Sequence, residues 1–480
     1  MRTITLELSP ASCKKALKEL EKYQKEIEYV LNSSEYYVNG TKTEGRSPML
    51  KVEGEFYVPL KNIAYGLSYS YEWQADTHTV FLVNKSKDRA IPYAYDLRKV
   101  SRSPQVKNQG NYGNCWAFAS LAVLESCILK ATGQSVDLSE ENMKNLMERY
   151  SVYGWNMETN EGGHDEIGLG YLAAWLGPVL ESDDLYDDNS HLSPLLESIL
   201  HIQNIAFITR TSYTDNAEIK RAIINYGGVY SGLYMSARYS SALKAYYQYV
   251  KSDFNRNHAV EIVGWDDTIN IPNAPGPGAW IAKNSWGPDW GDDGYFYISY
   301  YDVTCAKVNS EFSVFTFILN DTIKYDKNYQ YDVPGKTDYF YSASKSTVWY
   351  KNVFKATENE YLAAVSTYFE KDTTYIVSVY VNGEFKFSKS GFRNAGYWTF
   401  DLGEFITLKE GDTFEVIFKI HTDGDVAKVS SREFMIPEPK LAITFGGYTS
   451  HSLYEEGDIE AANRANGFTL YEPMLSVNIS

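Results

Sequence analysis

One cysteine in this chain lies where a thiol can become a nucleophile. Cys115 follows a loop that contains Gly110 and Gly113, and apolar residues recur at helical spacing from Cys115 onward. Gly133 is a suitable residue to end that helix. Cys115 is therefore expected at a helix N-terminus, where free backbone N–H groups and the helix dipole stabilise a thiolate. This placement predicts nucleophilic thiol chemistry.

A thiol nucleophile needs a base and a group that orients the base. His258 and Asn284 have these residue types, and both lie in short apolar or β-branched runs that end at glycine. Such runs predict neighbouring strands of one sheet. Gln109, six residues before Cys115, is the expected side-chain donor to an oxyanion, together with the Cys115 backbone N–H. The set predicts acyl transfer through a cysteine thiolate.

Residues from about 91 to 301 resemble the papain-like cysteine peptidases (family C1). The matching segments occur in family order: Ile91-Pro92 with Asp96-Leu97-Arg98, Gln109 to Phe118, Gly162-Gly163, Gly227-Gly228-Val229, Asn257 to Val260, and Lys283 through Trp290-Gly291 to Gly294-Tyr295. The resemblance implies a cysteine endopeptidase with a helical left subdomain and a barrel-like right subdomain. It also implies that catalysis needs no metal or organic cofactor.

The resemblance further implies a set of substrate-binding residues beside the catalytic ones: Gly162, Gly163, Asn257, Ala259 and Trp286. The glycine pair matches a strand that binds the substrate backbone, where the lack of a side chain lets an extended peptide approach. Trp286 is expected to shield the hydrogen bond between His258 and Asn284 from water.

The cysteines indicate which branch of the family the chain resembles. There are four of them: Cys13, Cys115, Cys127 and Cys305. Cys115 and Cys127 share the predicted helix and stand roughly 18 Å apart along it, too far for a disulfide. Relatives usually pair a cysteine three residues before the nucleophile, where this chain has Tyr112, and Asn114 replaces the usual serine. The missing disulfides indicate a bacterial protein.

Length and pattern predict several domains. At 480 residues the chain has room for two to four. We expect an α+β fold in four parts: an amphipathic helical segment at 1–33, a small α+β module at 34–88, the papain-like peptidase at 89–318, and an all-β sandwich at 319–480. The second part resembles the copper-amine-oxidase-like N-terminal module. The last resembles the lectin-like domain of bacterial multidomain C1 proteins.

Local signals support these divisions. Ser9-Pro10 can start a helix whose apolar face includes Leu17, Leu20 and Ile27. Asn39-Gly40 and Asn382-Gly383 are strong signals for hairpin turns. Two questions stay open from the sequence: whether residues 1–90 are a cleaved prosegment, and whether the last domain binds sugar or serves as a structural partner.

Composition limits the partners. The formal net charge of −17 and the pI near 5.0 argue against nucleic acid or an anionic membrane surface. The expected partner is a protein or peptide substrate, with a glycan or cell-surface ligand as a second candidate at the C-terminal domain. An acidic cluster at Asp183, Asp184, Asp187 and Asp188 is better explained as a solvated loop than as a calcium site. We therefore expect no metal.

Location follows only from the resemblance, which implies a secreted or cell-surface protein. No secretory apolar region opens the chain and no run of 18 apolar residues is present, so a cytoplasmic location stays open.

Two other functions use the same residues. The first is a papain-fold adhesin or binding protein that cleaves weakly or not at all, favoured only by Tyr112 and Asn114. The second is a transglutaminase-like acyl transferase. It is disfavoured because such enzymes usually orient the histidine with aspartate and lack this spacing from Gln109 to Cys115.

Overall fold

The computed structural model describes residues 91–432, with gaps at 156, 159–160, 188–189, 251–255, 311–313, 320–321, 323–324, 331–334, 336–337 and 342–345, and it describes strands before residue 85 and at 472–479. The chain forms two compact units. One comprises Met1–Ile91 with Thr374–Ile376 and Ser388–Phe392, and the other comprises the rest of the chain.

The N-terminal region is described by its strands. They are β1 (Thr3–Glu7), β2 (Ile27–Tyr29), β3 (Glu35–Val38), β4 (Thr41–Glu44), β5 (Leu50–Val52), β6 (Glu55–Tyr57), β7 (Tyr69–Gln74) and β8 (Thr79–Asn84). The hairpin β3–β4 confirms the turn predicted at Asn39-Gly40, and β5–β6 and β7–β8 also pair as hairpins. The pairing of β1 with β8 was not predicted.

The helix predicted in residues 1–33 is wrong at its C-terminal end. Ile27–Tyr29 is a strand that pairs antiparallel with Tyr36–Val38. Isoleucine and tyrosine fit a pleated surface well, and pairing with β3 outweighs the helical spacing of Ile27. The earlier part of that helix, from Ser9-Pro10 through Leu20, lies outside the described residues.

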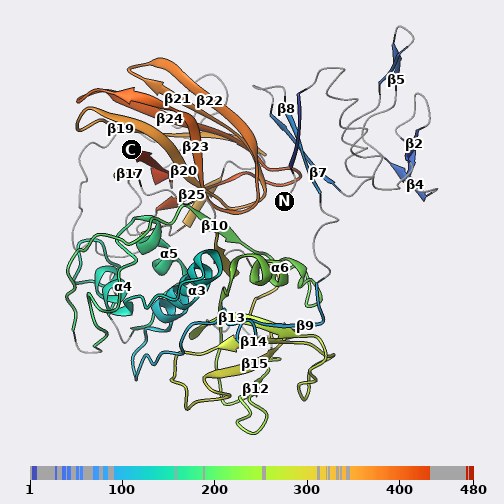
Figure 1. Cartoon of the computed structure of the whole chain (residues 1–480), viewed down its shortest axis with the longest axis vertical. Helices are drawn as coiled ribbons and strands as arrows, with labels where there is room; N and C mark the ends of the chain where they lie inside the picture. Colours follow the sequence, from blue (N-terminus) through green and yellow to red (C-terminus); the bar gives the residue numbers. More distant parts are fainter. Residues whose placement is uncertain are drawn as a thin grey trace. The chain divides into compact units, whose positions relative to one another are not determined.

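The described residues of the peptidase region include four helices. They are α3 (Cys115–Thr132), α4 (Glu140–Met147), α5 (Asp165–Ala173) and α6 (Ala217–Tyr226). Figure 1 shows α3, α4 and α5 grouped together, with strands β13, β14 and β15 forming a separate layer. Among the described helices, only α3 has the length and apolar composition of a membrane span, and 72% of it is buried inside the protein. This burial is expected of a core helix.

The strands of the peptidase region form one antiparallel sheet around the predicted histidine. They are β9 (Ala94–Asp96), β10 (Asn204–Phe207), β11 (Val229–Leu233), β12 (Ala245–Tyr246), β13 (His258–Asp266), β14 (Ala279–Lys283), β15 (Tyr295–Ser299) and β16 (Val314–Phe317). Their order is β12-β15-β14-β13-β11-β16-β10, and β9 pairs with β13. Only the β12–β15 pair within this run is parallel. β13, which begins at His258, pairs with β14, and Asn284 directly follows β14.

The C-terminal region is built of strands. They are β17 (Lys327–Gln330), β18 (Asp338–Tyr341), β19 (Thr347–Lys355), β20 (Glu360–Phe369), β21 (Thr373–Val381), β22 (Glu384–Arg393), β23 (Gly396–Leu408), β24 (Thr413–His421), β25 (Lys428–Arg432), β26 (Glu472–Pro473) and β27 (Leu475–Ile479). Asn382 and Gly383 have φ of 52° and 80°, as the predicted β21–β22 turn requires.

Two sheets of this region face each other, which confirms the predicted sandwich. One has the order β19-β24-β21-β22, and the other contains β23-β20-β27-β17. Phe418 of the first sheet lies 5.7 Å from Phe400 and 6.2 Å from Phe369 of the second, measured between ring centroids. Tyr350 and Thr367 also share a hydrogen bond of 2.9 Å between the two sheets.

The peptidase sheet continues into the C-terminal sheet. β10 pairs with β16 on one side and with β23 on the other, with Ile205 opposite Tyr397. Thr399 reinforces the junction, because its hydroxyl donates to the Gln203 carbonyl over 2.7 Å. The C-terminal region is thus hydrogen-bonded to the peptidase through its backbone.

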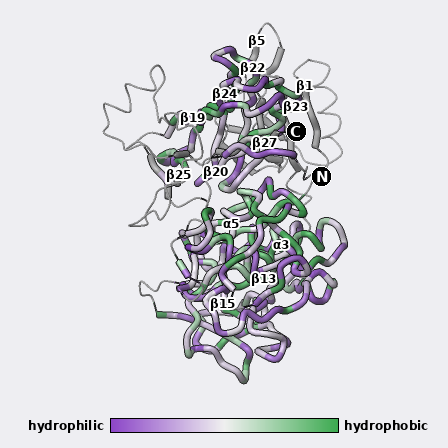
Figure 2. The backbone as a smooth tube through the Cα atoms, turned by 90° about the vertical axis from the view of Figure 1, so that its left-hand side faces the viewer, coloured by the Kyte–Doolittle hydropathy of each residue, from purple (hydrophilic) through white to green (hydrophobic). Residues whose placement is uncertain are grey.

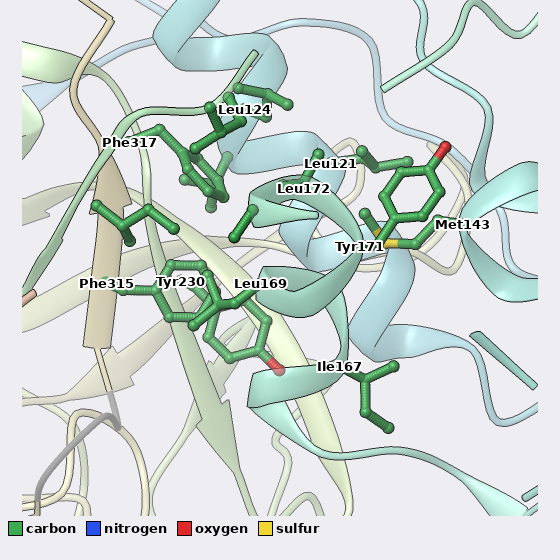
Figure 3. Packing of buried hydrophobic residues seen from close by; sticks show 14 of the residues in the cluster. Leu121, Leu124, Met143, Ile167, Leu169, Tyr171, Leu172, Tyr230, Phe315 and Phe317 are labelled. Atoms are coloured by element: carbon green, nitrogen blue, oxygen red, sulfur yellow. The ribbon is translucent and has the colours of Figure 1, made fainter. Parts of the chain in front are cut away.

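The hydrophobic core lies where α3 and α5 meet the sheet. Figure 2 shows hydrophobic residues gathered around α3. In Figure 3, Leu121 and Leu124 of α3 lie near Leu169 and Leu172 of α5. All four are buried, as are Phe315 and Phe317 of β16, which belong to the same cluster. This packing fixes the first turn of α3 against β13.

Candidate active site

Cys115 is the first residue of α3. The helix ends as predicted at Gly133, which has φ of 77° and whose N–H donates to the Leu129 carbonyl over 3.0 Å. Asn114 is the N-cap residue, yet its side chain makes no capping hydrogen bond. The first N–H groups of α3 therefore have no side-chain cap from Asn114. Cys115 itself is partly exposed, whereas Cys127 and Cys305 are buried.

His258 and Asn284 meet because their strands are antiparallel neighbours. His258 is the first residue of β13, and Asn284 directly follows the last residue of β14. Glu261 pairs with Lys283 in this register, which brings the start of one strand beside the end of the other. His258 Nε2 lies 2.7 Å from Asn284 Oδ1. Both residues are buried.

The Asn284 side chain fixes the tautomer of His258. Asn284 Oδ1 also accepts a hydrogen bond of 2.9 Å from the Ser285 backbone N–H, so this atom is the carbonyl oxygen of the amide. A carbonyl oxygen can only accept, and His258 Nε2 must therefore carry the hydrogen. The neutral ring then has its lone pair on Nδ1. An unprotonated Nδ1 is what a base for a thiol requires.

Trp286 packs on the ring of His258. The two ring centroids are 4.7 Å apart and the planes are inclined by 29°. Trp290 meets Trp286 edge-on at 5.0 Å and an interplanar angle of 88°. The Trp286 indole thus packs on the imidazole, and Trp290 packs on Trp286.

Gln109 is held by hydrogen bonds of both its backbone and its side chain. Its backbone N–H donates to the Ser285 carbonyl over 2.8 Å, and its side-chain Oε1 accepts from the Ser285 hydroxyl over 2.6 Å. Its Nε2 donates to the Tyr112 carbonyl over 2.7 Å. An amide nitrogen has two hydrogens, and one of them remains for another acceptor. Gln109 is therefore pre-oriented between the Cys115 loop and the segment that carries Asn284.

The two unusual loop residues keep this arrangement. Tyr112 contributes its backbone carbonyl to Gln109, which does not depend on its side chain. Asn114 Nδ2 donates to the Tyr186 hydroxyl over 2.9 Å, and that hydroxyl donates to the Gln109 carbonyl over 2.9 Å. The Tyr186 ring also meets Phe118 edge-on at 5.0 Å. Asn114 thus links the loop to Tyr186 instead of capping α3.

Burial opposes charge on both reacting groups. Desolvation raises the pKa of the Cys115 thiol to about 11, although hydrogen bonds from the backbone of Ala259 and Trp116 oppose the rise. Desolvation also lowers the pKa of His258 to about 4, against the hydrogen bond to Asn284. Each group on its own therefore favours its neutral form at neutral pH. Charge can develop there only as a pair, by proton transfer from Sγ to the ring.

Cys115 and His258 line one cleft of about 1120 Å³. Gly162, Gly163, Asn257 and Ala259 line it too, as the resemblance implied. Asn284 and Trp286 contact His258 of the cleft wall through the hydrogen bond and ring contact described above. The hydrogen-bond partners of Gln109 are instead residues of the adjoining Cys115 loop and Ser285.

The two glycines of the cleft have different structural reasons. Gly162 has φ of 79°, and a side chain there would meet no atom within 4 Å. A Cβ on Gly163 would lie 2.4 Å from the Trp116 indole. Glycine is thus needed at position 162 because of the positive φ, and at position 163 because a side chain would clash with Trp116. These reasons add to the predicted one, that a missing side chain lets the substrate backbone approach.

Asn257 and the acidic loop, two further candidates from the sequence, form hydrogen bonds with neighbouring residues of the protein. Asn257 accepts from the Met235 N–H over 2.7 Å and donates to the Met235 carbonyl over 3.0 Å. In the acidic loop, Asp184 accepts from the Asn142 amide over 2.9 Å. Within the part of the chain that the structure describes, no cluster of histidine, cysteine and acidic residues could hold a metal ion.

Sequence reasoning missed Ser285 and an ion pair in the cleft. Ser285 lies within the predicted run, between Asn284 and Trp286, and its polar side chain was the available signal. Asp165 and Arg256 also line the cleft and lie 2.5 Å apart between Oδ2 and Nη1. They are far apart in the sequence, and no spacing pattern connects them.

Family models match three parts of the chain. Residues 91–314 match the papain family cysteine protease model, residues 328–456 the lectin-like domain, and residues 14–82 the copper amine oxidase N-terminal domain. The last two agree with the resemblances seen in the sequence.

Curated relatives match the peptidase region. Pro-cathepsin H of Bos taurus is 30% identical over 214 residues, which are 43% of this chain and 59% of the relative. The viral cathepsin of Autographa californica nuclear polyhedrosis virus is 31% identical over 222 residues, 45% of this chain and 62% of the relative. The chain thus spans about six tenths of the length of these relatives.

Two solved structures are similar over most of the chain. One is the clostridial cysteine protease Cwp84 after propeptide cleavage, with a TM-score of 0.66, 22% identity, and coverage of 81% of this chain and 99% of that one. The other contains the cysteine protease and lectin-like domains of Cwp84, a surface-layer-associated protein of Clostridium difficile. Its TM-score is 0.67, with 21% identity and coverage of 82% and 89%. These similarities show that the peptidase and lectin-like folds occur together elsewhere. Residues 91–314 of this chain are a domain of the papain family of cysteine proteases, and residues 328–456 are a lectin-like domain.

Proposed function

We propose that this protein is a cysteine endopeptidase in which Cys115 is the nucleophile and His258 the general base and acid. The observation that carries the proposal is the tautomer of His258. Its Nε2–H is committed to Asn284, which leaves Nδ1 as the basic nitrogen, and His258 lines the same cleft as Cys115 at the start of α3. The resemblance to papain-family proteases supports the same assignment.

The reaction begins with transfer of the Cys115 proton to Nδ1 of His258. The thiolate attacks a peptide carbonyl carbon, and the resulting oxyanion accepts hydrogen bonds from the free hydrogen of Gln109 Nε2 and from the Cys115 backbone N–H. The carbon–nitrogen bond then breaks as His258 returns its proton to the leaving amine. A thioester remains. His258 takes a proton from water, which attacks the thioester and releases the acid and the thiol.

The accessory parts suggest where the enzyme acts. Cwp84, which shares the combination of folds, is described as surface-layer associated. We propose by analogy that this protein also acts at a cell surface, on a protein or peptide substrate. The lectin-like domain is a candidate site for a glycan or another cell-surface ligand.

Hydrolysis of a mixture of fluorogenic peptides by the full chain tests the proposal. Cys115→Ala should abolish cleavage and leave the thermal unfolding transition in place. Cys127→Ala is a matched control, because Cys127 lies on the same helix but is buried away from the cleft. This control should retain cleavage. Wild-type-like hydrolysis by Cys115→Ala would refute the mechanism, and a folded wild type that cleaves nothing would favour the binding-protein alternative.

A further inference from the structure

The cleft that contains the nucleophile also contains an ion pair whose carboxylate is buried. Asp165 begins α5 and is 8% exposed. Its Oδ2 lies 2.5 Å from Arg256 Nη1, and its Oδ1 accepts a hydrogen bond of 2.8 Å from the Tyr230 hydroxyl. All three residues line the same cleft as Cys115. The wall beside the thiol is therefore polar.

The position of this wall is fixed from behind. The Tyr230 ring belongs to the hydrophobic cluster of α3, α5 and β16 and stacks on Phe315 with centroids 4.4 Å apart. Figure 3 shows Tyr230 beside Phe315 within this cluster. The hydroxyl that holds Asp165 thus belongs to a tyrosine whose ring is fixed in the core. Asp165 in turn holds Nη1 of the Arg256 guanidinium group.

The remaining N–H groups of the Arg256 guanidinium are available to the cleft. Its side chain is 32% exposed, and its aliphatic stem packs over Gly232, where a Cβ would lie 2.8 Å from Cδ. Guanidinium has five N–H donors, and among the described residues only Asp165 engages them. Burial raises the pKa of Asp165 to about 6 against the charge of Arg256, so the carboxylate depends on the arginine remaining nearby.

We propose that Arg256, positioned by Asp165 and Tyr230, selects substrates with a side-chain oxygen acceptor near the scissile bond. This inference rests on the proposed peptidase function. An aspartate, glutamate, asparagine or glutamine side chain can accept from the remaining N–H groups of Arg256. An aliphatic side chain would cover those groups without pairing them, and a lysine would be repelled by the guanidinium. A site built for hydrogen bonding rejects a ligand that lacks the partner.

Peptides that vary one position at a time on either side of the scissile bond test the proposal with the full chain. Glutamate and glutamine at one of those positions should give kcat/KM at least about tenfold above leucine and lysine. Arg256→Met, which preserves length without donors, should reduce this preference to less than about threefold. Arg256→Lys should give an intermediate preference, because it retains the charge but loses the fork.

Lys307→Met is the matched control, since Lys307 also lines the cleft. It should leave the preference in place, and a loss equal to that of Arg256→Met would overturn the assignment to Arg256. Thermal unfolding shows that each variant is folded. A preference for leucine or for lysine at every position would overturn this inference and leave the peptidase intact. If the wild type cleaves no peptide at all, the proposed function itself fails.

Discussion

Asn284 Oδ1 accepts two hydrogen bonds, one from His258 Nε2 at 2.7 Å and one from the Ser285 N–H at 2.9 Å. The second bond identifies the atom as oxygen and thereby decides which nitrogen of His258 carries hydrogen. The Asn284 amide thus fixes the tautomer of His258. The Ser285 backbone N–H, which follows β14, in turn fixes the orientation of that amide.

Asn284→Ala should lower kcat by about 10²-fold, the scale on which positioned acid–base catalysis contributes. The variant removes the acceptor of Nε2–H, so both tautomers become accessible and the ring is free to turn. KM should change little, because Asn284 contacts His258 rather than the substrate. Steady-state kinetics of the folded variant measures kcat and KM separately and so tests both expectations. Unchanged kcat would show that the ring is oriented by Trp286 alone.

The pH dependence of Cys115 alkylation should reflect the lowered pKa of His258, which is about 4. Below that pH the ring already carries a proton and cannot take one from the thiol. The rate with iodoacetamide should therefore rise as the pH increases through about 4, and then stay level through neutral pH. Rates measured from pH 3 to 8, with peptide mapping of the adduct, check this. A midpoint near 9 would indicate an ordinary thiol without a base.

Alanine at the two cleft glycines should destabilise the fold for different reasons. Gly163→Ala places a Cβ 2.4 Å from Trp116 and should cost about 1–3 kcal/mol of unfolding free energy through overpacking. Gly162→Ala meets no neighbour but must adopt a φ of 79°, which costs about 1–2 kcal/mol. Denaturant unfolding measures both. Asparagine, which tolerates positive φ, should restore stability at 162 and not at 163; equal rescue at both positions would contradict the distinction.

Asn114→Ser should leave kcat/KM within about tenfold of wild type, because the variant disrupts a single hydrogen bond, to Tyr186. Tyr186→Phe removes that bond and the one to the Gln109 carbonyl, so it should have the larger effect. Kinetics of the two variants compares them. A gain well above tenfold in Asn114→Ser would mean that asparagine is retained for a purpose other than hydrolysis.

Much of the site could be predicted from the sequence, because its pieces are local. A glycine-containing loop before an apolar helix placed Cys115, and two apolar runs placed His258 and Asn284 on neighbouring strands. The ion pair of Asp165 and Arg256 could not be predicted, since it depends on how the start of α5 and the segment before β13 come together in the tertiary structure. The contacts of Tyr186 could not be predicted either, because they arise from tertiary packing.

The fold shows the same division between local and long-range information. Asn382-Gly383 predicted its hairpin, because the turn requires positive φ at both residues. The strand at Ile27–Tyr29 was predicted as helix, because its role depends on pairing with β3. Nor could the pairing of β10 with β23 be foreseen, since no local pattern indicates which strand edges meet.

Labelling of the full chain with an epoxysuccinyl inhibitor, followed by intact mass and peptide mapping, tests the central claim most directly. The account predicts one adduct, on Cys115, formed in the wild type and lost in His258→Ala. Cys127 and Cys305 should remain unlabelled in the folded protein, because both are buried. Equal labelling of the wild type and His258→Ala, or a folded wild type that acquires no adduct on Cys115, would contradict a thiol activated by His258.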